Sequence, residues 1–215
     1  MAEVRKFVVN RKEKEILDDL ERYRELALSL GASEAKIIGA HEIIFDPRVR
    51  LKCMYPKCRW FGTNAHCPPH APEVEKIVSM VSRYKHGIFY CIRVPTEDFV
   101  GNYTDSEGQP KPAKRQLLNY KISSSLESAA FYDGYVLAVG FAGGPCKPVF
   151  CPTKDCSAIM PGQGCRAAGK ARTSMEGACM YAFAMAAEAG WDIYPCGPTA
   201  ENVPHGNALG MVLID

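Results

Sequence analysis

Long apolar runs are missing from this chain of 215 residues. No stretch approaches the roughly 20 apolar residues that a membrane-spanning helix needs. The first residues are charged and lack the apolar segment of a secretory signal. The sequence therefore predicts a cytoplasmic protein that does not contact a membrane. We expect a single domain over residues 1–215, because the length allows a full core and no linker divides the chain.

An excess of charge of one sign is also missing. The chain has 26 Lys and Arg against 24 Asp and Glu, a formal net charge of +2. Its basic residues are scattered along the sequence, and this distribution argues against a nucleic-acid partner.

Short nucleotide-binding motifs are absent as well. The sequence contains neither a G-x-G-x-x-G run after a strand nor a Walker motif, so nothing in it indicates a nicotinamide or ATP site. The sequence leaves open whether the protein binds a flavin or docks with a corrinoid protein. No Ser–His–Asp arrangement can be recognised, and the catalytic residues are unknown at this stage.

Cysteine, by contrast, is abundant and ordered. Seven of the ten cysteines form two groups: six of them repeat the spacing C-x4-C-x8-C, and the seventh stands another x4 step before the second repeat. Thiolates at this density usually hold a soft metal or an iron–sulfur cluster. A cytoplasmic chain keeps its thiols reduced, which disfavours disulfides. The predicted metal ligands are Cys53, Cys58, Cys67, Cys146, Cys151, Cys156 and Cys165.

The loops around these cysteines favour one or two [4Fe–4S] clusters. Gly and Pro let the backbone wrap closely around a cluster and turn N–H groups toward its sulfurs. The alternative is zinc, in a structural, interaction or metal-handling protein without redox activity. Zinc sites usually pair cysteines as C-x2-C, and neither group contains that pair. A third reading, a thiol–disulfide or metal-trafficking protein, ranks last.

The first group has three ligands, whereas the second has four. Either another residue supplies the fourth ligand, or one iron is left open to bind a substrate as a Lewis acid. The candidate fourth ligands are Cys179, Cys196 and Cys91, with His66 and His70 behind them. Cys91 lies in an apolar strand and Cys179 in a predicted helix, so both are more typical of core residues.

A basic tract follows the last cysteine of the second group. Arg166, Lys170 and Arg172 precede a predicted helix that Thr173 or Ser174 could cap, and a helix start can bind an anion. An ordinary solvated turn is the competing reading.

Helices and apolar strands alternate along the chain, which predicts an α/β or α+β fold with one central sheet flanked by helices and two cysteine-rich metal-binding loops. Helices are expected over 13–30, 72–84, 113–132 and 172–189, strands over 35–44, 87–94, 135–141 and 208–214, and a long loop over 95–112.

Three runs carry a family resemblance: DPRVRLKCMYPKCRWFGTNAHCPPHAP, the second cysteine group with KARTSMEG, and the closing GMVLID. Together they resemble a family of small cysteine-rich predicted metal-binding proteins, found mainly in anaerobic microbes, over nearly the whole chain. The resemblance implies a strand through DPRVRLKC and a metal site, most plausibly iron–sulfur, on the seven cysteines named above. Cys179 departs from the family pattern, and it could supply a fourth ligand.

These observations lead to one expectation of function. The chain is predicted to be an iron–sulfur oxidoreductase or electron-transfer protein, whose partner is a redox protein or a small-molecule substrate.

Overall fold

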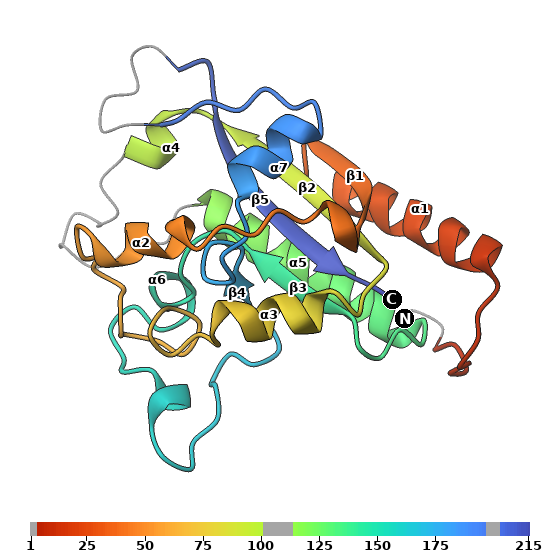
Figure 1. Cartoon of the computed structure of the whole chain (residues 1–215), viewed down its shortest axis with the longest axis horizontal. Helices are drawn as coiled ribbons and strands as arrows, with labels where there is room; N and C mark the ends of the chain where they lie inside the picture. Colours follow the sequence, from red (N-terminus) through yellow and green to blue (C-terminus); the bar gives the residue numbers. More distant parts are fainter. Residues whose placement is uncertain (1–3, 101–113, 197–202) are drawn as a thin grey trace.

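The computed structural model describes residues 4–100, 114–196 and 203–215. Within these ranges the chain forms one five-stranded mixed sheet with helices on both faces (Figure 1). This architecture confirms the predicted α/β class with a single sheet. The elements are α1 (Glu13–Ser29), β1 (Glu34–Gly39), the 3₁₀ turn η1 (Ala40–Glu42), α2 (Arg48–Met54), α3 (Val74–Val81), β2 (His86–Val94), α4 (Glu97–Val100), α5 (Lys114–Tyr132), β3 (Val139–Ala142), α6 (Lys147–Phe150), the 3₁₀ turn η2 (Ser157–Ile159), β4 (Thr173–Ser174), α7 (Ala182–Glu188) and β5 (Gly206–Leu213).

The strands lie in the order β1-β2-β5-β3-β4. Neighbouring strands run antiparallel, except that β3 and β4 are parallel. The long central pair, β2 and β5, sets the register of the sheet, with Phe89 opposite Met211. The last strand of the sequence therefore occupies the middle of the sheet.

Both faces of the sheet are buried, because successive side chains of a strand point to opposite faces. On one face, Ile88 and Tyr90 of β2 pack against buried residues of α1 and α5, among them Leu20 and Leu126. On the other face, Phe89 packs with the buried residues of α3 and α7. The molecule thus has three layers, and the cysteine-bearing loops lie outside them (Figure 1).

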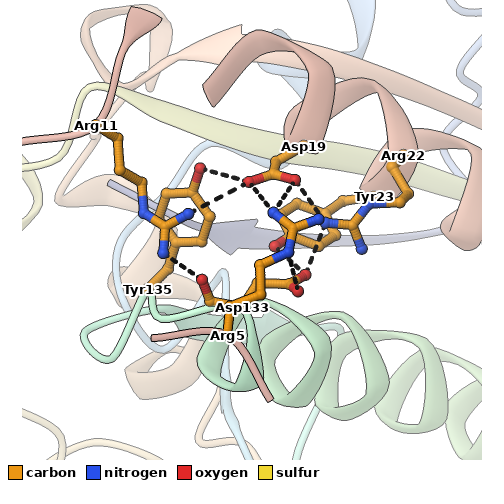
Figure 2. A network of polar contacts seen from close by, with 7 residues as sticks. All are labelled: Arg5, Arg11, Asp19, Arg22, Tyr23, Asp133 and Tyr135. Carbon is orange, nitrogen blue, oxygen red and sulfur yellow. Dashed lines mark hydrogen bonds and ion pairs between the residues drawn. The ribbon is translucent and has the colours of Figure 1, made fainter. Parts of the chain in front are cut away.

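A polar network joins the N-terminal segment to the helical face (Figure 2). Asp19 of α1 is buried and accepts hydrogen bonds from Arg5 at 2.7 Å, Arg22 at 2.6 Å and Tyr135 at 3.0 Å. Arg22 also donates to Asp133, in the turn after α5, at 2.7 Å. Two buried carboxylates therefore connect α1, the residues before it and the end of α5.

The network keeps Asp19 ionised. Burial opposes its charge, but the hydrogen bonds from Arg22, Arg5 and Tyr135 outweigh that cost, so the pKa of Asp19 lies below its ordinary value of 3.8. The aspartate therefore contributes to stability at neutral pH, and this contribution depends on its charge.

Several predicted boundaries need correction. The strand expected over 35–44 ends at Gly39, because the chain turns there into η1. The strand expected through DPRVRLKC is wrong: residues Arg48–Met54 form helix α2. The strand expected over 135–141 begins only at Val139. The loop expected over 95–112 contains the short helix α4, and its part from 101 to 112 lies outside the described residues.

The helix predicted over 172–189 is wrong in its first half. Thr173 and Ser174 form β4 beside β3, and a tight turn follows in which Ser174 Oγ accepts the Gly177 N–H at 2.9 Å. Cys179 has a positive φ of 59° in this turn, so it does not lie within a helix. Only residues from Ala182 onward are helical, as α7.

The part of the chain that the structure describes contains no helix that is both long and apolar enough to cross a membrane.

Candidate metal centre

The first cysteine group begins on a helix that a single arginine anchors. Cys53 lies in the last turn of α2, and Cys58 and Cys67 follow in the loop after it. Arg50 of α2 donates through Nη2 to the Gly177 carbonyl at 2.7 Å and also hydrogen-bonds the Pro72 carbonyl. These contacts fix α2 between the turn before α7 and the end of the cysteine loop.

The second group starts in a turn that is held against α5. Tyr120 donates its hydroxyl to the Gly144 carbonyl at 2.9 Å, and Gln116 Nε2 donates to the Pro145 carbonyl at 2.9 Å. Gly144 has a positive φ of 74°, which glycine adopts without steric cost. This turn fixes the position of Cys146, which is the N-cap residue of the one-turn helix α6.

Asn64 joins the two groups. It is fully buried, and its Oδ1 accepts the His66 N–H at 3.1 Å and lies 3.7 Å from the Cys146 thiol. Its backbone carbonyl accepts the Cys67 N–H at 3.3 Å. Nearby, Lys147 Nζ reaches the Thr63 carbonyl at 3.5 Å. The end of the first loop and the start of the second are therefore in direct contact.

The pKa values of Cys67 and Cys146 agree with this contact between the two groups. Burial, followed by the nearby thiols Cys53 and Cys58, raises the pKa of Cys67 to about 11, although a hydrogen bond with Asn64 acts against the rise. Burial also raises the pKa of Cys146 to about 12, and the neighbouring thiols that add to it are Cys67, Cys156, Cys165 and Cys151. Cys67 and Cys146 thus form the junction between the groups.

Backbone N–H groups already point at two of the sulfurs. The Trp60 N–H donates to Cys58 Sγ at 3.5 Å, and the Ala167 N–H donates to Cys165 Sγ at 3.4 Å. In each group the donor stands two residues after the cysteine. Such bonds favour the thiolate form, and they are typical of sulfurs that ligate iron–sulfur clusters.

All ten cysteines are free thiols, and each of the seven predicted ligands is half-buried. Residues 36–214 match the family described as "Predicted metal-binding protein (DUF2284)". The chain belongs to this family. Among the helices, α1 alone precedes the matched DUF2284 region, so both cysteine groups and all of the sheet except the first two residues of β1 lie within it. No curated protein and no solved structure matches the chain significantly.

The donors that this DUF2284 chain offers suit a soft metal, because they are thiols in loops with N–H groups directed at sulfur. Across the described ranges, no three His, Cys, Asp or Glu side chains converge closely enough to hold a metal ion. The loops therefore bring the two groups together without closing either group around one point.

The three candidate fourth ligands lie in different places. Cys179 is buried in the turn before α7, close enough to Cys53 to contribute to the raised pKa of that thiol, after burial and closer charges. Cys91 is buried within β2, with its thiol 3.4 Å from Asn207 Oδ1. Cys196 lies 3.9 Å from the Tyr194 carbonyl. By these contacts, Cys179 is the candidate placed beside the first group.

The histidine candidates differ in burial. His66 Nδ1 is buried and has no hydrogen-bond partner in the described part of the chain, whereas His70 is exposed. Burial lowers the pKa of His66, so its ring is neutral at pH 7. A neutral imidazole with a vacant nitrogen has the chemistry of a ligand, and it lies next to Cys67 in sequence.

The anion site predicted after the second group does not form. Arg172 makes a two-pronged ion pair with Glu127, with both N–O distances at 2.7 Å, and Arg166 donates to the Asp155 carbonyl at 2.6 Å. The expected helix start at Thr173 is a strand. These arginines therefore hold the loop in place.

Sequence reasoning missed three residues of this DUF2284 centre: Asn64, Tyr120 and Glu176. Asn64 had a weak signal, because a polar amide between two cysteines of one loop can bond to the backbone locally. Tyr120 had none, and Glu176 had only its place in the KARTSMEG run, since the proximity of both to the thiols depends on contacts between distant segments.

Proposed function

We propose that this DUF2284 protein binds iron–sulfur clusters of the [4Fe–4S] type at its two cysteine groups. The seven ligands would be Cys53, Cys58, Cys67, Cys146, Cys151, Cys156 and Cys165. The observation that carries the proposal is the contact between the two groups through Asn64, with one backbone N–H donor aimed at a sulfur in each group.

Iron–sulfur clusters supply one-electron chemistry, and an iron with an open position can also bind a substrate. Two adjacent groups suit the passage of single electrons, and the smaller ligand set of the first group suits reductive chemistry on a substrate there. We propose electron transfer or reduction as the activity, with a redox protein or a small molecule as the partner. Ten free thiols fit the reducing cytoplasm.

Other residues of the protein position the cysteine ligands. The turn from Gly143 to Pro145, fixed by α5, orients Cys146. Arg50 orients α2, which carries Cys53. Cys67 and Cys146 are half-buried at the junction between the groups, beside the fully buried Asn64.

The test is anaerobic purification followed by a visible spectrum and a count of iron, acid-labile sulfide and zinc per chain. Two clusters of this type give about eight irons and eight sulfides in a brown protein that dithionite bleaches. A colourless protein with one or two zincs would contradict the proposal and support a structural or metal-handling role.

Two variants test the ligand assignment. Cys165→Ser is expected to remove one cluster, halving the iron and sulfide content. Cys91→Ala is the matched control, because Cys91 lies in the sheet core and should not change the metal count. Unchanged iron in Cys165→Ser would contradict the assignment of the second group.

Cys179→Gly examines the fourth ligand of the first group. Glycine accepts the positive φ of 59° at this position, so the backbone of the turn should be retained. Loss of iron from this variant would assign the Cys179 thiol to the first cluster. Full iron content would leave that cluster with three cysteine ligands or with a ligand from elsewhere, such as His66.

A further inference from the structure

Acidic residues are nearly absent from the two segments that carry the cysteine groups. Residues 47–72 contain five basic side chains and no acidic one, and residues 143–172 contain five basic side chains and one acidic residue, Asp155. The rest of the chain has 16 basic and 23 acidic residues, a net charge of −7. The small net charge of the whole chain therefore hides a separation of charge, with a positive part around the cysteines and a negative part elsewhere.

The two segments lie together in the fold, so their charges add on one side of the molecule. Asn64 lies against the Cys146 thiol, and Lys147 reaches the Thr63 carbonyl. In Figure 1, α2 and α6 both lie on the left, whereas α1, with six acidic and three basic residues, begins on the right. The separation of charge along the sequence is therefore also a separation in space.

Some of the basic side chains of these segments are already engaged. Arg48 pairs with Asp46, Arg172 pairs with Glu127, and Arg50 binds backbone carbonyls. Six others are exposed and form no ion pair with a described residue: Lys52, Lys57, Arg59, Lys154, Arg166 and Lys170. These six make the surface around the cysteine groups positive.

Bound clusters would leave this surface positive. The seven proposed ligands add negative charge as thiolates, but a [4Fe–4S] core is itself positive, because its ferrous and ferric ions outweigh its sulfides. The seven thiols are half-buried, whereas the six basic side chains are exposed. A partner that approaches from solvent therefore meets the positive charges first.

Helix α2 adds an apolar centre to this surface. None of its seven residues is buried, and Leu51, Met54 and the C-cap residue Tyr55 are exposed by 43–70%. An apolar centre within a charged rim is the usual composition of a protein–protein interface. Cys53 lies on the same helix, so a partner bound there would lie beside the first cysteine group. The docking patch is defined by six exposed residues: Leu51, Lys52, Met54, Tyr55, Lys57 and Arg59.

The docking patch suits an acidic protein better than a nucleic acid. Phosphate groups are bound by charged and polar side chains, so the exposed Leu51 and Met54 would contribute nothing to such contacts. An acidic protein with a small apolar contact area matches both the rim and the centre of the patch. Opposite charges raise the rate of encounter by about 10–10³-fold at low ionic strength, and small transient interfaces are typical of electron-transfer complexes.

We propose that the docking patch binds an acidic one-electron carrier protein and so places its redox centre beside Cys53. In the step that follows docking, one electron leaves the reduced carrier, which is thereby oxidised, and reduces the first cluster by one electron. No proton is transferred, and no covalent bond forms or breaks. The electron transfer rests on the proposed function, whereas docking requires only the charges and the apolar centre.

The probes are two acidic carriers, a ferredoxin and a flavodoxin, and the basic carrier cytochrome c is their counterpart. Binding of each to the full chain, purified anaerobically with its metal, is measured by biolayer interferometry. The ionic strengths are about 0.01 M and about 0.1 M, at which charges are screened beyond roughly 30 Å and 10 Å. At least one acidic carrier is expected to bind at the lower value and about tenfold or more weakly at the higher, whereas cytochrome c should not bind.

A triple variant locates the binding. Lys52→Gln/Lys57→Gln/Arg59→Gln is expected to weaken the acidic carrier about tenfold or more at low ionic strength and to lose most of the salt dependence. The matched control removes the same charge from exposed positions near the start of α1, as Lys6→Gln/Lys12→Gln/Lys14→Gln. The control should change the affinity less than about twofold, since its charges lie far from the docking patch.

Tyr55→Ser tests the apolar centre and does not change the charge. It is expected to weaken the acidic carrier about fivefold at both ionic strengths, as truncation of an aromatic residue at the centre of an interface does. Iron content is counted for every variant. If the triple variant loses iron, Tyr55→Ser decides, and an unchanged affinity in that variant contradicts the proposal.

Three further results would overturn the proposal: neither acidic carrier binds, the two triple variants bind the carrier equally, or a short DNA duplex binds the patch more tightly than the carrier does. The two proposals can fail separately. A protein with the expected iron and sulfide that binds no acidic carrier refutes the docking patch alone. A protein without iron that binds the carrier through these charges refutes only the proposed cluster binding.

Discussion

At the scale of single residues, the junction between the cysteine groups depends on Asn64. Its side-chain oxygen accepts the His66 N–H and meets the Cys146 thiol inside the protein, where water cannot replace it. An unmade hydrogen bond in such a place costs about 1–3 kcal/mol.

We therefore expect Asn64→Leu, which keeps the volume but removes the acceptor, to lower the free energy of unfolding by about 1–3 kcal/mol. It should also reduce the iron bound per chain, because Cys67 and Cys146 lose their common anchor. Urea denaturation and metal analysis measure the two effects. Asn10→Leu, at an exposed position, is the control. A variant with normal metal content would show that Asn64 does not position the groups.

Gly144 offers a second test at this scale. A Cβ added to Gly144 would lie 2.9 Å from Gln116 Nε2, on a residue with a φ of +74°. Gly144→Ala is expected to cost about 1–2 kcal/mol of unfolding free energy, the usual penalty for a left-handed L-residue. In Gly169→Ala the new Cβ meets nothing within 4 Å, so its urea midpoint should not fall. Equal midpoints for the two variants would contradict the role of the turn.

At the scale of elements, α2 and the turn before α7 depend on each other. Arg50 of α2 binds the Gly177 carbonyl with two N–H groups, at 3.2 Å and 2.7 Å. The helix that carries Cys53 is thereby fixed to a segment more than a hundred residues later. This contact explains why RVRLKCM is helical although its apolar alternation is typical of a strand.

Arg50→Gln is expected to lower the free energy of unfolding by about 1–3 kcal/mol, since removal of the charged donor leaves the carbonyl of the buried Gly177 unpaired. Arg48→Gln is the matched control on the same helix, because the Arg48 side chain is 83% exposed. Thermal denaturation followed by circular dichroism compares the two variants. Equal melting temperatures would show that the contact of Arg50 with the turn before α7 does not stabilise the protein.

The helices that sequence pattern predicted best are those with one apolar face. Helix α1 shows this pattern clearly, with Leu20, Tyr23 and Ala27 buried and charged residues opposite. The helix prediction failed in the segment before α7, because Met175, Ala178 and Met180 are all buried and their spacing therefore shows no helical period. They are buried in the hydrophobic cluster that α3, α7 and one face of the sheet share, a tertiary arrangement that no local pattern encodes.

The sequence predicted the cysteines of the candidate site but not the contacts between them. Cysteine spacing alone identified both loops and indicated metal binding, and membership of the DUF2284 family confirms a predicted metal-binding protein. The contact of Asn64 with Cys146, across 82 residues, could not be foreseen. A cavity of about 460 Å³ lined by Trp60, Asn119 and Pro145, among others, was equally hidden, because its wall combines six separated segments of the chain.

At the scale of the whole molecule, the network around Asp19 makes stability depend on pH (Figure 2). The pKa of Asp19 is lowered in the folded protein, so its contribution is complete above the ordinary value of 3.8 and is lost as the pH falls through the lowered pKa. The protein should therefore lose stability on acidification in this range.

Asp19→Asn removes the charge and should lower the free energy of unfolding at pH 7 by about 1–3 kcal/mol. Below pH 3.8 the difference from the wild type should shrink, because the wild-type aspartate then becomes neutral as well. The control is Asp18→Asn, because Asp18 directly precedes Asp19 in α1 and is exposed. Urea denaturation across this pH range measures both, and a difference that does not change with pH would contradict the assignment.

The central position of β5 has a consequence for biosynthesis. Because β5 joins β2 to β3 and is the last strand in the sequence, a nascent chain carries both cysteine groups out of the ribosome before the sheet can close. Until then β1 and β2 can pair only with each other, and β3, which leads to the loop with Cys146, has no place beside them in the sheet. We expect the metal centre to assemble only after β5 has joined the sheet, so that a pulse-labelled chain becomes protease-resistant before it acquires iron.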